Sequence, residues 1–108
     1  MAGEVERLCH AFRIAAGTEE EYVRRHHEIW PEMIEAMHAA GFSNYSLSGR
    51  GLDVVAYCEC SPDVDTCFAR FAAHDVGARW QEYMRGIVLD LTDADGRLVR
   101  YSEDWHLP

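Results

Sequence analysis

A tyrosine and a histidine four residues apart form the first pair in this sequence that could carry out chemistry. Tyr22 and His26 lie in a segment with helical features, and side chains at positions i and i+4 of a helix project from the same face. An imidazole can give or take a proton near neutral pH, while a phenol can donate to, accept from or polarise a bound oxygen. The pair could therefore shuttle protons on one ligand, although two such residues one turn apart are more often packing or surface residues.

The helix that would carry this pair has sequence signals at both ends. Thr18 followed by Glu21 has the pattern of a capping box, three acidic residues fill the first turn, and Gly41 can end the segment. Pro31 removes an intrahelical hydrogen bond and clashes with the preceding turn. We therefore expect two stacked helical pieces with a kink or break near Trp30.

Strand patterns precede and follow this helical segment. Alternation of apolar and polar residues predicts a strand over residues 5–14, and two further strands over 42–48 and 52–60 are joined by the sequence Gly49-Arg50-Gly51. Such a short, glycine-flanked connection predicts an antiparallel hairpin. A turn at residues 93–96 and a fourth strand over 97–107 follow near the end of the chain.

Two more helices are expected between the hairpin and the last strand. Ser61 and Pro62 offer an N-cap and a first-turn proline for one of them. Asp75 offers a cap for the second, which the spacing of apolar residues extends to about Val88.

This order of elements predicts an α+β fold with a ferredoxin-like antiparallel sheet and helices on one face. At 108 residues, the chain is expected to form one domain over residues 1–108. Both faces of the strands carry apolar residues, which places Tyr45, Leu47, Val55 and Tyr57 opposite Phe42, Val54 and Ala56. We therefore expect the uncovered face to meet protein or ligand, and predict a homodimer with a cavity between sheet and helices or between subunits.

The composition of the chain limits the classes of molecule that the protein can bind. A formal net charge of −9 disfavours nucleic acid and anionic lipid, which leaves a neutral small molecule as the better candidate. The sequence shows neither an apolar run long enough to span a membrane nor a signal-like N-terminus, so a cytoplasmic location is expected. Cysteines at positions 9, 58, 60 and 67 lack paired CxxC spacing, and we expect reduced thiols rather than a zinc site.

Longer motifs around Tyr22 and His26 resemble the L-rhamnose mutarotase family. Residues 21–26 (EYVRRH) and 29–33 (IWPEM) are similar to its E-Y-x-x-R-H-x-x-I-W-P-E signature. Residues 44–45 (NY), 79–84 (RWQEYM) and 107–108 (LP) match further family motifs in the same order. The similarity thus spans nearly the whole chain.

The resemblance implies a dimeric α/β barrel that interconverts the α and β anomers of L-rhamnose or a related deoxy aldose. The matched site residues are Tyr22, His26, Tyr45 and Trp80. In the family, the histidine matching His26 is the proton donor, and the tyrosine matching Tyr22 contacts the sugar and assists proton movement. Ring opening and closure need only acid and base, so no metal, nucleotide or other cofactor is expected.

Three positions depart from the family pattern. Gln81 stands where the family has a second tryptophan, so it cannot stack on a sugar but can hydrogen-bond a hydroxyl. His10 replaces a usually apolar residue, and His106 stands where an aromatic residue is common. These imidazoles fit either a different substrate or a structural role.

Two other functions remain compatible with the residues. Small ferredoxin-like dimers also act as cofactor-independent polyketide cyclases or oxygenases, whose cavities use His, Trp and Tyr on aromatic substrates. A non-catalytic sugar-binding or dimerisation module would keep the stacking residues without needing His26.

Overall fold

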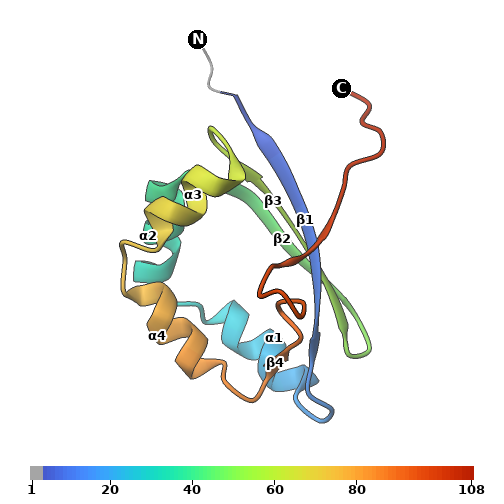
Figure 1. Cartoon of the computed structure of the whole chain (residues 1–108). Helices are drawn as coiled ribbons and strands as arrows, with labels where there is room; N and C mark the ends of the chain where they lie inside the picture. The colour runs from blue at the N-terminus through green and yellow to red at the C-terminus, as the bar shows by residue number, and fades with distance from the viewer. Residues whose placement is uncertain (1–3) are drawn as a thin grey trace.

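A computed structural model describes residues 4–108 and shows an antiparallel sheet whose helices lie on one face (Figure 1). The strands are ordered β2-β3-β1-β4, and β5 pairs with the same edge of β1 as β4. The elements in chain order are β1 (Glu6–Ile14), α1 (Glu19–His27), α2 (Pro31–Ala40), β2 (Phe42–Arg50), β3 (Asp53–Cys60), α3 (Val64–Phe71), α4 (Val76–Tyr83), β4 (Val88–Leu89) and β5 (Val99–Tyr101). The expected α+β architecture is confirmed, while residues 1–3 of the expected domain lie outside the described part.

The predicted break at Pro31 is confirmed. Helix α1 ends at His27, and Pro31 occupies the first turn of α2 after Trp30 adopts an extended backbone. Gly41 ends α2 in the left-handed conformation, with φ of 109°. The capping-box prediction is wrong, because the Thr18 hydroxyl donates to the Ala15 carbonyl at 2.6 Å and makes no cap hydrogen bond to α1.

The β2–β3 hairpin is confirmed, but a bulge in β2 changes which face its residues occupy. The pairing register shifts between Ser43 and Ser46, where Asn44 has a positive φ. Leu47 consequently pairs with Ala56 and lies on the helix-covered face. The expected grouping of Leu47 with Val55 and Tyr57 is therefore wrong, because the extra residue reverses the alternation of side chains.

The starts of α3 and α4 depart from expectation. Asp63, not Ser61, caps α3, and its carboxylate accepts a hydrogen bond from the Thr66 amide at 2.7 Å. Asp75 occupies the N-cap position of α4, but its carboxylate pairs with Arg79 instead of capping the helix.

The last third of the chain is less regular than expected. Helix α4 ends at Tyr83 instead of near Val88, because Gly86 takes a left-handed conformation and the chain then turns into β4. The turn at residues 93–96 is confirmed by a hydrogen bond from Gly96 to Asp93. Only Val99–Tyr101 of the expected strand over 97–107 pairs with β1, and beyond it Glu103 meets Arg7 only through side chains.

The covered face of the sheet holds two distinct clusters. The packed end, beneath α2 and α3, consists of Leu8, Ala40, Phe42, Cys58, Cys60, Val64 and Cys67. The aromatic end, toward α1 and α4, consists of Phe12, Ile14, Tyr22, Val54, Ala56, Met84 and Ile87, with Trp80 packed against it. All four cysteines are free thiols, as expected. None of the helices in residues 4–108 is both long and apolar enough to cross a membrane.

Candidate functional site

Helix α1 brings Tyr22 and His26 together, as their spacing predicts. Their ring centroids are 4.5 Å apart; Tyr22 is only 6% exposed and His26 is half-buried. The backbone of α1 makes fewer close contacts with the strands than those of α2 and α3 do. Tyr22 reaches the sheet by meeting Phe12 of β1 edge-on, with 6.2 Å between ring centroids. The pair thus lies at the interface of α1 with the aromatic end.

A hydrogen bond defines how His26 exchanges protons. Its Nδ1 atom lies 2.9 Å from the Tyr22 backbone carbonyl, which can only accept, so Nδ1 carries the hydrogen in the neutral ring. The other nitrogen, Nε2, is then the atom that takes or gives a proton. Burial lowers the pKa of His26, the bond to the Tyr22 carbonyl opposes this shift, and the charge of His27 adds to it. His26 is therefore neutral at pH 7 and able to act as a base.

Trp80 of α4 completes an aromatic wall around His26. The Trp80 ring meets His26 edge-on at 5.4 Å and Trp30 at 5.1 Å between centroids. Helix α4 is held to α1 by Arg25, whose guanidinium lies 4.2 Å from the centre of the Tyr83 ring and donates to the Tyr83 carbonyl. The orientation of His26 therefore depends on both helices.

Tyr45 reaches the same region from the bulge in β2. The residue as a whole is 43% exposed, but burial of its phenol raises the pKa of Tyr45, and the nearby Cys58 and Tyr22 raise it further. Burial also raises the pKa of Tyr22 to about 12. Both phenols remain protonated at neutral pH, so they can donate hydrogen bonds to a ligand oxygen.

Two buried side-chain polar atoms in the described part of the chain have no hydrogen-bond partner. They are the Tyr22 hydroxyl and Nδ1 of His10. Leaving a buried polar group unpaired costs about 1–3 kcal/mol, so such groups are rare unless they serve a function. The alternation over residues 5–14 puts His10 on the same face as Phe12, but nothing in the sequence shows that its Nδ1 atom would lack a partner.

The remaining candidates lie elsewhere. Gln81 is exposed on α4, and its contact with a ligand remains a prediction. His106 is half-exposed in the C-terminal segment, where it lies 3.7 Å from Glu103. Among residues 4–108, no three His, Cys, Asp or Glu side chains are grouped so that they could hold a metal ion.

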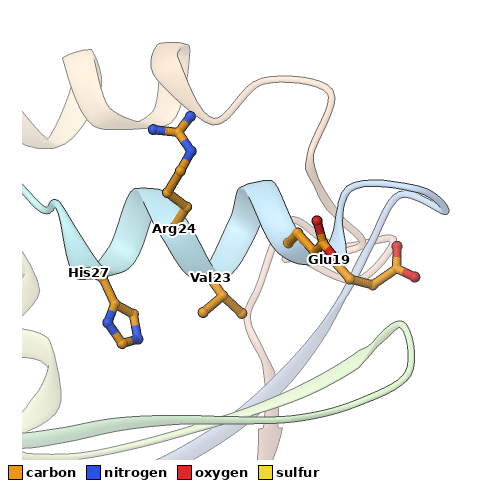
Figure 2. Close-up of a pocket in the computed structure, with 5 residues that line it drawn as sticks. Glu19, Val23, Arg24 and His27 are labelled. Carbon is orange, nitrogen blue, oxygen red and sulfur yellow. The ribbon is translucent and has the colours of Figure 1, made fainter.

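Two surface concavities lie away from the Tyr22–His26 pair. An open groove of about 590 Å³ follows α1, where Val23 and His27 point to one side and Arg24 to the other (Figure 2). The second, of about 350 Å³, lies on the uncovered face of the sheet beside Tyr57 and Trp105. Neither is bordered by Tyr22 or His26, and the Tyr22 hydroxyl is buried inside the protein.

Comparison with known proteins finds relatives along almost the whole chain. A family model described as L-rhamnose mutarotase matches residues 7–107. A relative named L-rhamnose mutarotase from Agrobacterium fabrum is 55% identical over 105 residues, covering 97% of this chain and 98% of the relative. Another of the same name from Burkholderia orbicola is 34% identical over 95 residues, covering 88% and 89% of the two chains.

A solved structure shares the fold. The crystal structure of an L-rhamnose mutarotase from Formosa agariphila matches 95% of this chain and 99% of that chain, with a TM-score of 0.75 and 21% identity. The relatives favour the mutarotase interpretation and lend no support to the cyclase or oxygenase alternative. By its sequence along almost its full length, this chain belongs to the L-rhamnose mutarotase family.

Proposed function

We propose that this protein is an isomerase that interconverts the α and β anomers of L-rhamnose or a related deoxy aldose. The observation that carries the proposal is the His26 imidazole, which is neutral, fixed through Nδ1 and backed by the Tyr22 phenol. Family membership supports the same reaction, because the relatives bear the name of this activity.

The proposed reaction opens the sugar ring and closes it again. Nε2 of His26 takes the proton of the anomeric hydroxyl, a carbonyl forms at the anomeric carbon, and the bond to the ring oxygen breaks. A phenol, from Tyr22 or Tyr45, supplies a proton to the ring oxygen as that bond breaks. Rotation of the open-chain aldehyde and closure on its other face give the second anomer. On closure the phenolate takes back the proton of the hydroxyl group that re-forms the ring, and the His26 imidazolium returns its proton to the former carbonyl oxygen, which is the donor role that the family resemblance implies.

Trp80 and Gln81 are proposed to bind the sugar rather than react with it. The Trp80 ring beside His26 offers a stacking surface, and the Gln81 amide offers hydrogen bonds to a hydroxyl. No residue of this mechanism requires a metal or a cofactor.

Magnetisation-exchange NMR on L-rhamnose tests the proposed function directly. The wild-type protein should accelerate exchange between anomers, and His26→Ala should lose roughly 10²- to 10⁴-fold of the acceleration, the usual contribution of a positioned acid or base. His27→Ala is the matched control, because His27 is exposed on the same helix. Equal exchange rates for His26→Ala and wild type would refute the catalytic role, and no acceleration by the wild type with any common aldose would refute the function.

The uncovered face of the sheet supports the homodimer that we also propose. Register places Ala11 of β1 between Val55 of β3 and Val99 of β5, and a second row joins Cys9, Tyr57 and Tyr101. The nearby C-terminal segment leaves Trp105 77% and Leu107 71% exposed. An apolar strip that crosses three strands is best covered by a second copy of the chain.

Sedimentation analysis tests this interface. Val55→Asp places a charge in the centre of the apolar strip and should convert a dimer into a monomer, whereas a wild-type monomer at micromolar concentration would contradict the proposal.

We also propose a cytoplasmic location, because free thiols are typical of proteins in that reducing compartment.

A further inference from the structure

His10 lies on the covered face of the sheet at the border of the two clusters. It is 4% exposed and follows Leu8 of the packed end and precedes Phe12 of the aromatic end on the same face of β1. Its ring centroid is 6.2 Å from that of Phe12, which in turn is 6.2 Å from that of Tyr22. His10 is thus connected to the catalytic pair through a single aromatic ring.

The surroundings of His10 provide no partner for Nδ1. Its pairing neighbour on β3 is Ala56, whose methyl group cannot form a hydrogen bond. Its neighbour on β5 is Arg100, whose guanidinium is bound to Glu6 at 2.9 Å. Nδ1 therefore remains unpaired inside the protein, at a cost that a phenylalanine in the same place would avoid.

The Tyr22 hydroxyl is the second unpaired atom. Together the two atoms indicate the kind of ligand that could form a hydrogen bond with each of them. A carboxylate or a cation would have to leave water for a largely apolar interior. A hydroxyl group can both donate and accept, so it can satisfy an imidazole nitrogen in either tautomer and a phenol as well. Both unpaired atoms are therefore suited to bind a neutral, polyhydroxylated molecule.

We infer that His10 is a specificity-determining residue whose Nδ1 hydrogen-bonds one hydroxyl group of the bound sugar from the sheet, while His26 reacts from α1. This inference rests on the proposed function. His10 would recognise a hydroxyl group that does not take part in the reaction. It would therefore affect the choice of sugar more than the rate of ring opening.

Substrate analogues that lack single hydroxyl groups test the role. We would measure kcat/KM for anomer exchange of L-rhamnose and its 2-, 3- and 4-deoxy analogues with the wild type and with His10→Phe. In the wild type, one analogue should react about tenfold less efficiently than L-rhamnose because it leaves Nδ1 unpaired. His10→Phe should abolish the difference for that analogue and leave the other ratios unchanged.

Other outcomes separate this inference from the proposed function. Identical ratios in both proteins, or an equal loss for all substrates in His10→Phe, would overturn the role of His10 while leaving the mutarotase activity intact. Absence of exchange with every sugar in the wild type would instead overturn the proposed function, and the inference with it.

A measurement on the wild-type protein does not depend on how the variant folds. The ¹⁵N resonance of His10 Nδ1 should shift when L-rhamnose is added to saturation, and should shift less with the analogue identified above. An unchanged Nδ1 resonance at saturating sugar would also overturn the inference.

Discussion

The packed end and the aromatic end of the core lie on the same strands but differ in how their side chains pack. At the packed end, Leu8 and Cys58 are almost fully buried, and the close approach of Gly41 to Ser61 and Cys67 leaves no space for even one methyl group. At the aromatic end, rings meet edge-on and two polar atoms nearby, on Tyr22 and His10, remain unpaired. One end is closely packed, whereas the other carries unpaired polar atoms and the residues of the proposed reaction.

This difference follows from how closely the helices approach the sheet. Helices α2 and α3 pack on each other and on the strands, whereas α1 reaches the sheet through the Tyr22 side chain. Large side chains that bridge a wide gap can carry polar groups into it, while a close backbone contact cannot. The proposed catalytic pair is therefore located where the helix makes less close contact with the strands.

The largest effect should come from adding a methyl group at the packed end. In Gly41→Ala, the new Cβ would lie 2.3 Å from the Ser61 carbonyl oxygen and 2.8 Å from Cys67 Sγ, and the backbone has φ of +109°. Overpacking and left-handed strain together should lower the free energy of unfolding by about 3 kcal/mol or more. Urea denaturation measures this loss.

The matched control for Gly41 is Gly51, at the hairpin turn. It also has a positive φ, +62°, but nothing lies within 4 Å of an added Cβ. Gly51→Ala should therefore cost only about 1 kcal/mol of conformational strain. Similar losses in the two variants would show that the end beneath α2 and α3 is not tightly packed.

Removing the unpaired hydroxyl at the aromatic end should affect rate but not stability. Tyr22→Phe keeps the ring that packs on Phe12 and His26 and deletes an oxygen that has no partner within the protein. We expect kcat for anomer exchange to fall roughly tenfold to a hundredfold, with an unfolding midpoint equal to or above that of the wild type. A loss of stability without loss of rate would reverse the roles assigned to the two ends.

Local signals in the sequence were sufficient for most of the fold and for the central pair. The proline at position 31 predicted the break between α1 and α2, and the spacing of Tyr22 and His26 predicted their shared face, because both depend on helix geometry within one or two turns. The bulge at Asn44 was not predictable, since the left-handed conformation of that residue depends on pairing with β3.

The same limit applies to the capping residue of α3 and to the unpaired state of His10. Ser61 and Asp63 are both good capping residues, and only the path of the chain before α3 selects Asp63. The alternation in β1 placed His10 on the face with Leu8, yet the absence of a partner depends on Ala56 and Arg100 in other strands. The unpaired state of His10 therefore follows from its burial in the tertiary structure and not from the local sequence pattern.

The fall of kcat/KM at acidic pH should reflect the protonation of His26. Because burial lowers its pKa, the neutral base is present at pH 7 and is lost only as the pH falls below the ordinary value of 6.5. The inflection in kcat/KM should therefore lie below pH 6.5. In His27→Gln it should move upward, because the neighbouring charge that helps lower the pKa is gone. An inflection at or above 6.5 would mean that His26 is exposed to water.

The smallest effect concerns stability between pH 7 and pH 5. Burial lowers the pKa of His10, so the unfolded chain binds a proton more readily than the folded protein, and the free energy of unfolding should fall as the pH drops below 6.5. The acidic groups with lowered pKa values, such as Glu6 and Asp63, lose their contribution only at lower pH, below about 4.5 for a glutamate. In His10→Phe the decline between pH 7 and pH 5 should be weaker, with the residual slope arising from His26, whose pKa is lowered in the same direction. Urea titrations of both proteins at the two pH values measure the difference, and parallel declines would show that His10 is already paired or hydrated inside the folded protein.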